Sequence, residues 1–112
     1  MHLTTQQSLA LWHAVTLDQV LDEKPDLTAR QLAILLIIYM EAPPHTVRGL
    51  AERLNVTKPV ITRALDSMGQ KSLVKRKRDE ADKRNVLVQR TVEGSQFLEH
   101  LAQTITTRAE GI

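Results

Sequence analysis

The sequence predicts a mainly α-helical fold with one small β-hairpin, that is, an α+β fold of about five helices and a sheet of two to three strands. Three observations predict it: helix-start signals precede several apolar runs, two β-prone runs flank one polar turn, and positive charge gathers around that turn. With 112 residues, the chain is long enough for one folded unit and too short for two. We therefore expect a single domain over residues 1–112.

The composition excludes several classes of protein. The chain has no cysteine, which excludes disulfides, thiolate metal sites and cysteine redox chemistry. Since the amino terminus is also not signal-like, the sequence favours a cytoplasmic protein. The longest apolar run, Leu32–Met40, has nine residues, whereas a membrane-spanning helix needs about 20. We expect no membrane span.

The first and last predicted helices flank the rest of the chain. Over residues 4–23, apolar side chains fall on nearly every side of a helix, which indicates burial on more than one side. One flank is expected to cover the chain's own core and the other to contact a second subunit. Residues 92–109 carry an apolar stripe on one side only. The side chains predicted to form the dimer contact are Leu9, Trp12, Val15, Phe97, Leu98, Leu101 and Ile105.

The strongest helix-start signal precedes the longest apolar run. Thr28 is a typical N-cap and Gln31, three residues later, is its capping-box partner. This pair predicts a helix over residues 29–41, which we take as the central helix of the core. Two prolines at 43–44 break the chain, and residues 45–46 are expected to be briefly extended.

Two shorter helices follow, joined by a turn of about three residues. The first covers residues 47–54 after the cap Thr46 and is amphipathic. Asn55 can adopt the left-handed conformation that closes a helix, and Thr57 can cap the next one. A connection this short makes the pair a helix-turn-helix. The core-facing residues of the second helix are Ile61, Leu65 and Met68.

A hairpin completes the pattern. Two β-prone runs, residues 73–78 and 85–90, flank the polar turn at residues 79–84, and Thr91 is expected to cap the last helix. A helix-turn-helix followed by such a hairpin is a winged helix-turn-helix. Its predicted core and wing cover residues 28–91, with flanking helices at 4–23 and 92–109.

The charge is distributed very unevenly. Residues 57–90 hold ten basic and four acidic side chains, a local balance of +6, whereas the stretches on either side each have a balance of −2. A basic block between acidic ends is typical of a protein that meets phosphate on one side. A solvated, charged hairpin is the alternative, and charge alone does not decide between them.

These residues resemble the MarR family of winged-helix transcriptional regulators over about Leu27–Leu101. The most specific part is the D-x-R pattern of Asp82 and Arg84, followed by the T-x-x-G pattern of Thr91 and Gly94. The other matching residues are Leu27, Thr28, Gln31, Thr46, Val47, Leu50, Ala51, Leu54, Thr62, Arg63, Leu73, Val74 and Asp79.

Three positions depart from the family's pattern. Gly49 stands where an acidic residue is usual, Ser72 where a glycine normally ends the recognition helix, and Arg90 where an inward leucine is expected. Ser72 is expected to be strained if its φ is positive. Arg90 is expected to lay its stem over the edge of the core and to leave its charge to water or phosphate.

The start of the second helix of the pair has side chains suited to DNA. Short polar and cationic groups reach base edges in the major groove, and the first N–H groups of the helix favour phosphate. Lys58 and Arg63 can read guanine or hold phosphate, and Pro59 or Val60 can touch a thymine methyl group. A solvent-facing helix is the alternative. The predicted contacts are Thr57, Lys58, Pro59, Val60, Thr62 and Arg63.

For the wing, the resemblance implies that Lys83 or Arg84 enters the minor groove, with Asp79 and Asp82 structuring the tip. The alternative is an ion pair between Arg84 and one of these aspartates that only shapes the turn. The four cations at 75–78 alternate sides of a strand, so only two of them can face the duplex together. The predicted wing contacts are Lys77, Arg78, Lys83 and Arg84.

The sequence predicts no catalysis and no bound metal or cofactor. The four histidines show no ligand spacing with one another or with carboxylates. The chain has neither a phosphate-cradling glycine loop nor a nucleophile in a recognisable setting. Trp12 and Phe97 are candidates to line a ligand cleft between the helical region and the winged part, although such residues more often form core or dimer contacts.

The expected function is regulation of transcription. The pattern favours a homodimer that binds double-stranded DNA sequence-specifically, as a repressor on a pseudo-palindromic operator. Two alternatives stay open. One is a winged-helix module whose basic hairpin binds an acidic protein partner. The other is a regulator that responds to a small-molecule effector held in a pocket beside Trp12.

Overall fold

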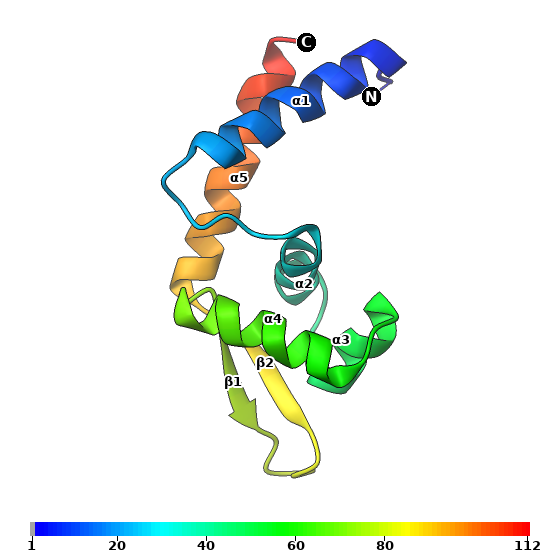
Figure 1. The fold of residues 1–112 in the computed structure, drawn as a ribbon, viewed down its shortest axis with the longest axis vertical. Coiled ribbons are helices and arrows are strands. Elements are labelled where there is room, and N and C mark those ends of the chain that lie inside the picture. Colours follow the sequence, from blue (N-terminus) through cyan, green and yellow to red (C-terminus); the bar gives the residue numbers. More distant parts are fainter. Residues whose placement is uncertain (1) are drawn as a thin grey trace. The chain divides into compact units, whose positions relative to one another are not determined.

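The computed structural model describes residues 2–112 and confirms the predicted fold class (Figure 1). The elements are α1 (Thr5–Leu21), α2 (Ala29–Met40), α3 (Val47–Leu54), α4 (Lys58–Gln70), β1 (Val74–Arg78), β2 (Val86–Arg90) and α5 (Val92–Glu110). They form two units. Leu27–Gln96 makes up a winged unit, and α1 together with α5 from Phe97 onward makes up a helical unit.

The core of the winged unit is built around α2. Its start is fixed by the predicted capping box, in which the Gln31 N–H donates to Thr28 Oγ1 at 3.1 Å and the Thr28 N–H donates to Gln31 Oε1 at 2.9 Å. The helix contacts α4 and β2. Its fully buried side chains are Ile34, Leu35 and Ile38.

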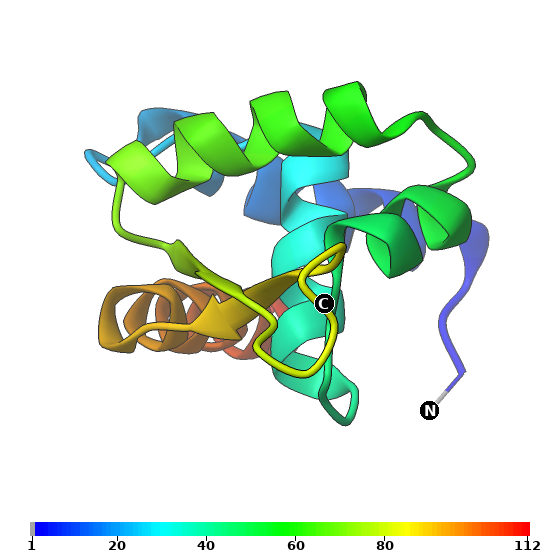
Figure 2. The ribbon, with the colours of Figure 1, turned by 90° about the horizontal axis from the view of Figure 1, so that it is seen from below.

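The helix-turn-helix forms as the local signals predict. Asn55 has a φ of 55° and a ψ of 47°, the left-handed conformation in which asparagine is better tolerated than most residues. The Val56 N–H donates to the carbonyl of Ala51 at 3.0 Å, and α4 begins two residues later. Figure 2 shows α3 and α4 joined by this short connection, with the hairpin next to them. The buried residues of α4 are Ile61, Leu65 and Met68.

The hairpin is an antiparallel sheet of two strands, and an extended segment pairs with its outer side. Val74 pairs with Arg90 at its base and Arg78 with Val86 near its tip. On the outer side of β2, the Val88 N–H donates to the His45 carbonyl at 2.8 Å, and Thr46 forms an isolated bridge with Leu87. The predicted extended segment at residues 45–46 thus pairs with β2 through an isolated bridge and does not form a strand of its own.

A hydrogen-bonded junction connects β2 to α5. Thr91 Oγ1 donates to the carbonyl of Ser72 at 2.7 Å and accepts from the Gly94 N–H at 3.0 Å. Tyr39 Oη donates to the Thr91 carbonyl at 2.6 Å and accepts from the Thr91 N–H at 2.8 Å. Ser72 has a φ of 61°, so the condition under which strain was predicted at this position is met.

Arg90 finds a partner that the sequence did not predict. The residue remains exposed, as expected, but its Nε donates to the carbonyl of Ile38 at 3.0 Å. Its guanidinium carbon lies 5.6 Å from the centre of the Tyr39 ring, within cation–π range. The head group is therefore held at the end of α2, and the expectation that it turns to water or phosphate was incomplete.

The helical unit has one buried residue in α1, Val15, and two in α5, Phe97 and Leu101. Arg108 binds Asp18 through two hydrogen bonds of 2.7 Å each. Other apolar side chains of α1 stay exposed. Within residues 2–112, no helix is long and apolar enough to cross a membrane.

Candidate nucleic-acid interface

The first turn of α4 is open to ligands. Thr57, Lys58, Pro59 and Arg63 are exposed, and Val60 and Thr62 are partly exposed. Thr57 occupies the N-cap position, but its side chain makes no capping hydrogen bond. In contrast, the Thr46 hydroxyl accepts a bond of 2.9 Å from the Gly49 N–H. The Thr57 hydroxyl thus remains available at the positive end of a helix, where anions are stabilised.

Next to this turn lies a basic depression between α3, α4 and the hairpin. We call it the basic crease and define it by Arg48, Lys58, Arg76 and Arg84, all of which are exposed. The cavity has a volume of about 240 Å³, and Thr62 and Asn85 supply further polar lining groups. Arg76 and Arg84 are paired with Asp66 and Asp82, so the excess positive charge comes from Arg48 and Lys58. A local excess of positive charge suits a phosphodiester backbone.

An ion pair fixes one side of the crease. Arg76 Nη2 lies 2.7 Å from Asp66 Oδ1, so β1 is tied directly to α4. Both side chains are partly exposed, and such pairs contribute little to stability. The pair is therefore informative mainly about geometry, because it shows that the side chains of β1 reach α4.

The wing tip is ordered by its two aspartates. Asp79 Oδ1 accepts from the N–H groups of Ala81 and Asp82 at 3.0 and 3.3 Å. Asp82 Oδ1 accepts from the Arg84 N–H at 3.1 Å and from Arg84 Nε at 3.0 Å, and its Oδ2 accepts from Nη2 at 3.2 Å. The hydrogen bonds from the Arg84 side chain and, to a smaller extent, from its backbone N–H hold the pKa of Asp82 below its ordinary value. The intramolecular pair that the sequence left as an alternative is therefore present.

Of the two cations at the wing tip, Lys83 is the less engaged. It is exposed, and within the described part of the chain no ion pair includes it. Lys83 can therefore bind a ligand without breaking an ion pair. For the Arg84 guanidinium to bind a ligand fully, its hydrogen bonds to Asp82 must be broken.

The strand cations divide between the two faces of the hairpin. Arg76 and Arg78 alternate with Lys77 along β1, so they share a face that Lys77 does not. The structure therefore brings Arg78 onto the face that carries the crease and leaves Lys77 on the opposite face. Both side chains are exposed.

Three residues at the crease were missed by sequence reasoning: Arg48, Arg76 and Asn85. Arg48 was recognisable only as an outward-facing helix residue, and Arg76 as one of four alternating cations. Their convergence depends on α3 packing against β2, a contact between segments far apart in the sequence. No local pattern reports such a contact.

Among residues 2–112 there is no group of three or more His, Cys, Asp or Glu side chains that could hold an ion.

The helix-turn-helix with a hairpin tied to its second helix defines the chain as a winged-helix protein. A model of the MarR family matches residues 27–86, more than half of the sequence. The chain therefore belongs to the MarR family, a family of transcriptional regulators.

Solved structures agree with this assignment. MarR itself is 27% identical with a TM-score of 0.69, and the match covers 94% of this chain and 75% of that one. Reduced AbfR bound to DNA is 25% identical, with a TM-score of 0.68 and coverage of 91% and 70%. The S. aureus MepR–DNA complex, 20% identical with a TM-score of 0.68 and coverage of 91% and 75%, shares the fold. No curated protein matches the sequence.

Proposed function

We propose that this chain is a sequence-specific double-stranded DNA-binding transcriptional regulator, a homodimeric repressor that binds a pseudo-palindromic operator. The observation that carries the proposal is the basic crease, in which four cations converge between the recognition helix and the wing. Two of the similar proteins, MepR and AbfR, have been solved with DNA.

The recognition helix α4 supplies the contacts to the major groove. Its exposed first turn places the Thr57 hydroxyl and the helix N–H groups at phosphate, and Lys58 with Arg63 at phosphate or guanine. Pro59 and Val60 offer apolar contact to thymine methyl groups. These groups lie on the side of α4 opposite its buried face.

The crease and the wing supply the remaining contacts. Arg48 and Arg76 flank Lys58 at the crease and bind a phosphate of the strand that passes the recognition helix. Lys83 or Arg84 enters the minor groove, where a narrow A·T tract concentrates negative potential. Before DNA binds, the ion pair with Asp82 holds the Arg84 side chain in place. On binding, DNA competes with Asp82 for the Arg84 guanidinium.

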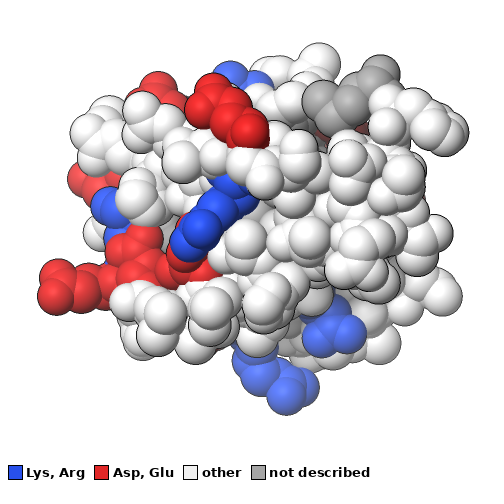
Figure 3. Space-filling view, turned by 90° about the horizontal axis from the view of Figure 1, so that it is seen from above, with Lys and Arg blue, Asp and Glu red and all other residues white. Residues whose placement is uncertain are grey.

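Homodimerisation uses the exposed side of the helical unit. Leu9 and Trp12 are 63% and 61% exposed, and such side chains on one helix form an apolar surface that a monomer rarely leaves uncovered. Figure 3 looks onto the end of the helical unit and shows a broad area without acidic or basic side chains. Val15, Phe97 and Leu101 were also predicted to form the dimer contact, but they are buried within the chain, so a partner subunit cannot reach them. Leu98 is partly exposed and Ile105 is exposed, so both remain candidates for the dimer contact.

Two half-sites about one helical turn apart follow from the twofold symmetry of such a dimer. Bound across a promoter, a dimer of this size represses by excluding polymerase, with no further surface required.

DNA binding is tested with a duplex from the chain's own upstream region at several salt concentrations. The logarithm of the association constant should fall linearly with the logarithm of salt concentration, with a slope of about −0.9 per phosphate contact. Arg48→Gln should reduce the slope by about one contact, whereas Arg30→Gln, an exposed arginine of α2 outside the crease, should not. A slope near zero, or no preference over random duplex, would contradict the proposal.

The role of the wing is tested by Arg84→Ala on duplexes that differ only in their flanks. The loss of affinity should be greatest where the flanks are rich in A·T pairs. An equal loss on every duplex would show that Arg84 contacts phosphate alone.

The dimer is tested by sedimentation at micromolar concentration. The wild-type chain should sediment as a dimer and Trp12→Glu as a monomer, because the introduced charge would be buried at the contact. Trp12→Phe keeps an apolar ring and should remain dimeric. A monomeric wild-type chain would rule out the proposed dimer.

A further inference from the structure

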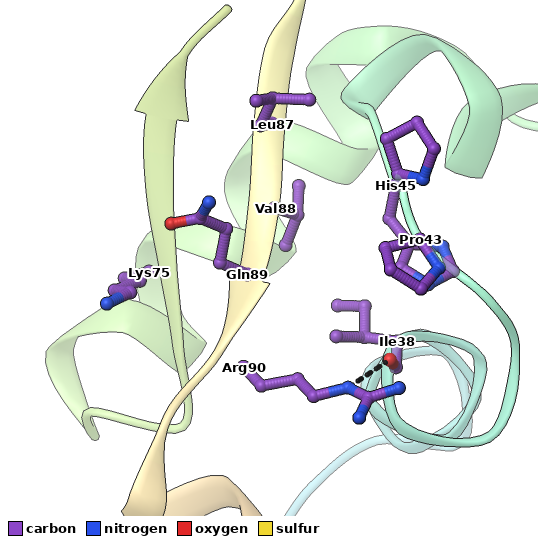
Figure 4. Close-up of a pocket in the computed structure, with 9 residues that line it drawn as sticks. Ile38, Pro43, His45, Lys75, Leu87, Val88, Gln89 and Arg90 are labelled. Atoms are coloured by element: carbon purple, nitrogen blue, oxygen red, sulfur yellow. Dashed lines mark hydrogen bonds between the residues drawn. The ribbon is translucent and has the colours of Figure 1, made fainter.

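The hairpin has one edge that pairs with another segment of the chain and one edge that does not. On the outer side of β2, the Val88 N–H donates to the His45 carbonyl at 2.8 Å, and Figure 4 shows His45 and its loop on the side of β2 away from β1. Within residues 2–112, β1 pairs with β2 alone, in a sheet of two strands. We call the outer side of Val74–Arg78 the free edge of this sheet.

The register of the hairpin identifies the backbone groups at the free edge. In an antiparallel pair, residues that exchange both backbone hydrogen bonds with the partner strand alternate with residues whose N–H and C=O groups point away from it. Because the Val88 N–H points away from β1, its partner Arg76 belongs to the second kind. The Asp79 N–H donates to the Asn85 carbonyl at 3.2 Å, as this alternation requires. The residues whose backbone groups point outward are thus Val74, Arg76 and Arg78.

The side chains along the free edge carry positive charge. Lys75, Arg76, Lys77 and Arg78 are all exposed. Arg76 is paired with Asp66 at 2.7 Å, whereas within residues 2–112 no ion pair includes the other three cations. Side chains alternate between the two faces of a strand, so Lys75 and Lys77 share one face and Arg78 lies on the other. Both faces of the edge therefore carry an unpaired cation.

An unpaired strand edge can accept a further strand, and its side chains decide which strand is accepted. A second copy of β1 would place cation opposite cation, which destabilises a pair of strands. An extended segment with carboxylates at alternate positions would place opposite charges next to each other. The phosphates of a nucleic acid offer acceptors only, so they would leave the outward carbonyls without donors. The edge thus matches an acidic polypeptide best.

We infer that the free edge is a docking site for an extended acidic segment of a protein partner, which adds a strand to the hairpin. The outward N–H and C=O groups of Val74, Arg76 and Arg78 bind the backbone of the segment, and Lys75 and Lys77 receive carboxylates on one face. In such pairing, backbone hydrogen bonds supply affinity and side chains supply specificity. The inference uses the backbone of β1 and does not rest on the proposed DNA binding.

The probe is a capped peptide in which glutamate alternates with threonine, and its control has lysine in place of every glutamate. Titration of the full chain with the glutamate peptide should shift the backbone amide resonances of Arg76 and Arg78. The amides of Lys75 and Lys77 should shift less, because the alternation directs them toward β2. The lysine peptide should shift none of these amides. Equal binding of the two peptides would overturn the inference, and so would shifts of Arg76 and Arg78 caused by a random DNA duplex but not by the glutamate peptide.

Methyl groups on the peptide nitrogens separate backbone pairing from charge. Only every second N–H of an added strand faces β1, so methylating one alternate set should weaken binding about tenfold or more. Methylating the other set leaves the charge of the peptide the same and should have little effect. Equal affinity of the two methylated peptides would mean that charge alone holds the peptide, which would refute the docking site.

Arg78→Pro and Arg78→Gln provide the corresponding comparison on the protein. Both remove the Arg78 charge, but only proline also removes the outward N–H, and proline is tolerated at such an edge position. Arg78→Pro should bind the glutamate peptide about threefold to tenfold more weakly than Arg78→Gln, the value of one hydrogen bond. Equal affinity of the two folded variants would contradict the pairing.

If circular dichroism shows that Arg78→Pro is unfolded, a second pair of variants tests the charges at the edge. Lys77→Gln should weaken binding of the glutamate peptide, because Lys77 loses its cation opposite a carboxylate. Lys24→Gln, at an exposed lysine outside the hairpin, should leave the affinity unchanged. The same affinity for both variants would exclude the free edge as the place where the peptide binds.

Discussion

Gly94 shows how one missing methyl group positions a whole helix. A Cβ at this position would overlap the Leu73 carbonyl and the Tyr39 hydroxyl. The first turn of α5 can therefore approach the end of α4 and the side of α2 only because residue 94 has no side chain. The T-x-x-G pattern thus has a packing cause in this chain.

Gly94→Ala is expected to destabilise the chain by about 1–3 kcal/mol, the usual cost of overpacking. Gly69→Ala is the matched control, because nothing lies within 4 Å of a Cβ built there. It should stabilise α4 by about 0.5–1 kcal/mol. Urea denaturation measures both values. A Gly94→Ala chain as stable as the wild type would mean that the junction relaxes freely.

Ser72 carries backbone strain that glycine would relieve. Its φ of 61° costs an ordinary residue roughly 1–2 kcal/mol, so Ser72→Gly should raise the free energy of unfolding by up to about 1 kcal/mol. Ser67→Gly, at a helical position of α4, should lower it. A lower melting temperature for Ser72→Gly would show that the serine side chain stabilises the folded state by more than its backbone strain costs.

At the scale of elements, the start of α4 differs from the starts of α2 and α3. Thr28 and Thr46 cap their helices with side-chain hydrogen bonds, whereas Thr57 does not. A helix start without its side-chain cap gives up some stability. In α4, the missing capping bond leaves the Thr57 hydroxyl free at the surface that we propose contacts phosphate.

Thr57→Ala and Thr46→Ala should therefore separate stability from binding. Thr46→Ala is expected to cost about 1 kcal/mol of stability, and Thr57→Ala only a few tenths. Thr57→Ala should nevertheless weaken DNA binding roughly threefold to tenfold, the value of one hydrogen bond. Thermal unfolding and DNA titration of the two variants provide the comparison. Unchanged DNA affinity for Thr57→Ala would remove Thr57 from the interface.

At the scale of the whole molecule, ion pairs join the first and last helices within the helical unit. The Arg108 guanidinium holds the pKa of Asp18 below its ordinary value. The pKa of Asp22 is lowered by the Lys24 N–H and, to a smaller extent, by His100, whose Nε2 lies 2.5 Å from Asp22 Oδ2. Both aspartates thus favour the folded state only while they are ionised.

The stability of this unit should therefore fall in acid. A carboxyl group whose pKa is lowered by folding stabilises the protein above its unfolded pKa of about 4, and this contribution is lost as the pH falls through the lower folded pKa. Asp18→Asn should lower the melting temperature near pH 7 and have progressively less effect below about pH 4. Asp26→Asn, at an exposed aspartate that forms no ion pair within residues 2–112, should change little. Parallel curves for wild type and Asp18→Asn across this range would contradict the assignment.

The sequence alone determined the order and type of the elements, because their signals are local. The capping box at Thr28, the left-handed Asn55 and the polar turn between two β-prone runs each act within a few residues. The same local reading placed Ile61, Leu65 and Met68 in the core, and it identified α4 and the wing as the candidate interface.

Only the tertiary structure decided which side chains come together. Arg48 and Arg76 join the crease because α3 and α4 pack against the hairpin. Arg90 turns to the carbonyl of Ile38, 52 residues earlier in the chain. In α1, Val15 is buried whereas Leu9, Trp12 and Val20 are left exposed. These outcomes depend on contacts between distant segments, and no local pattern of residues encodes such contacts.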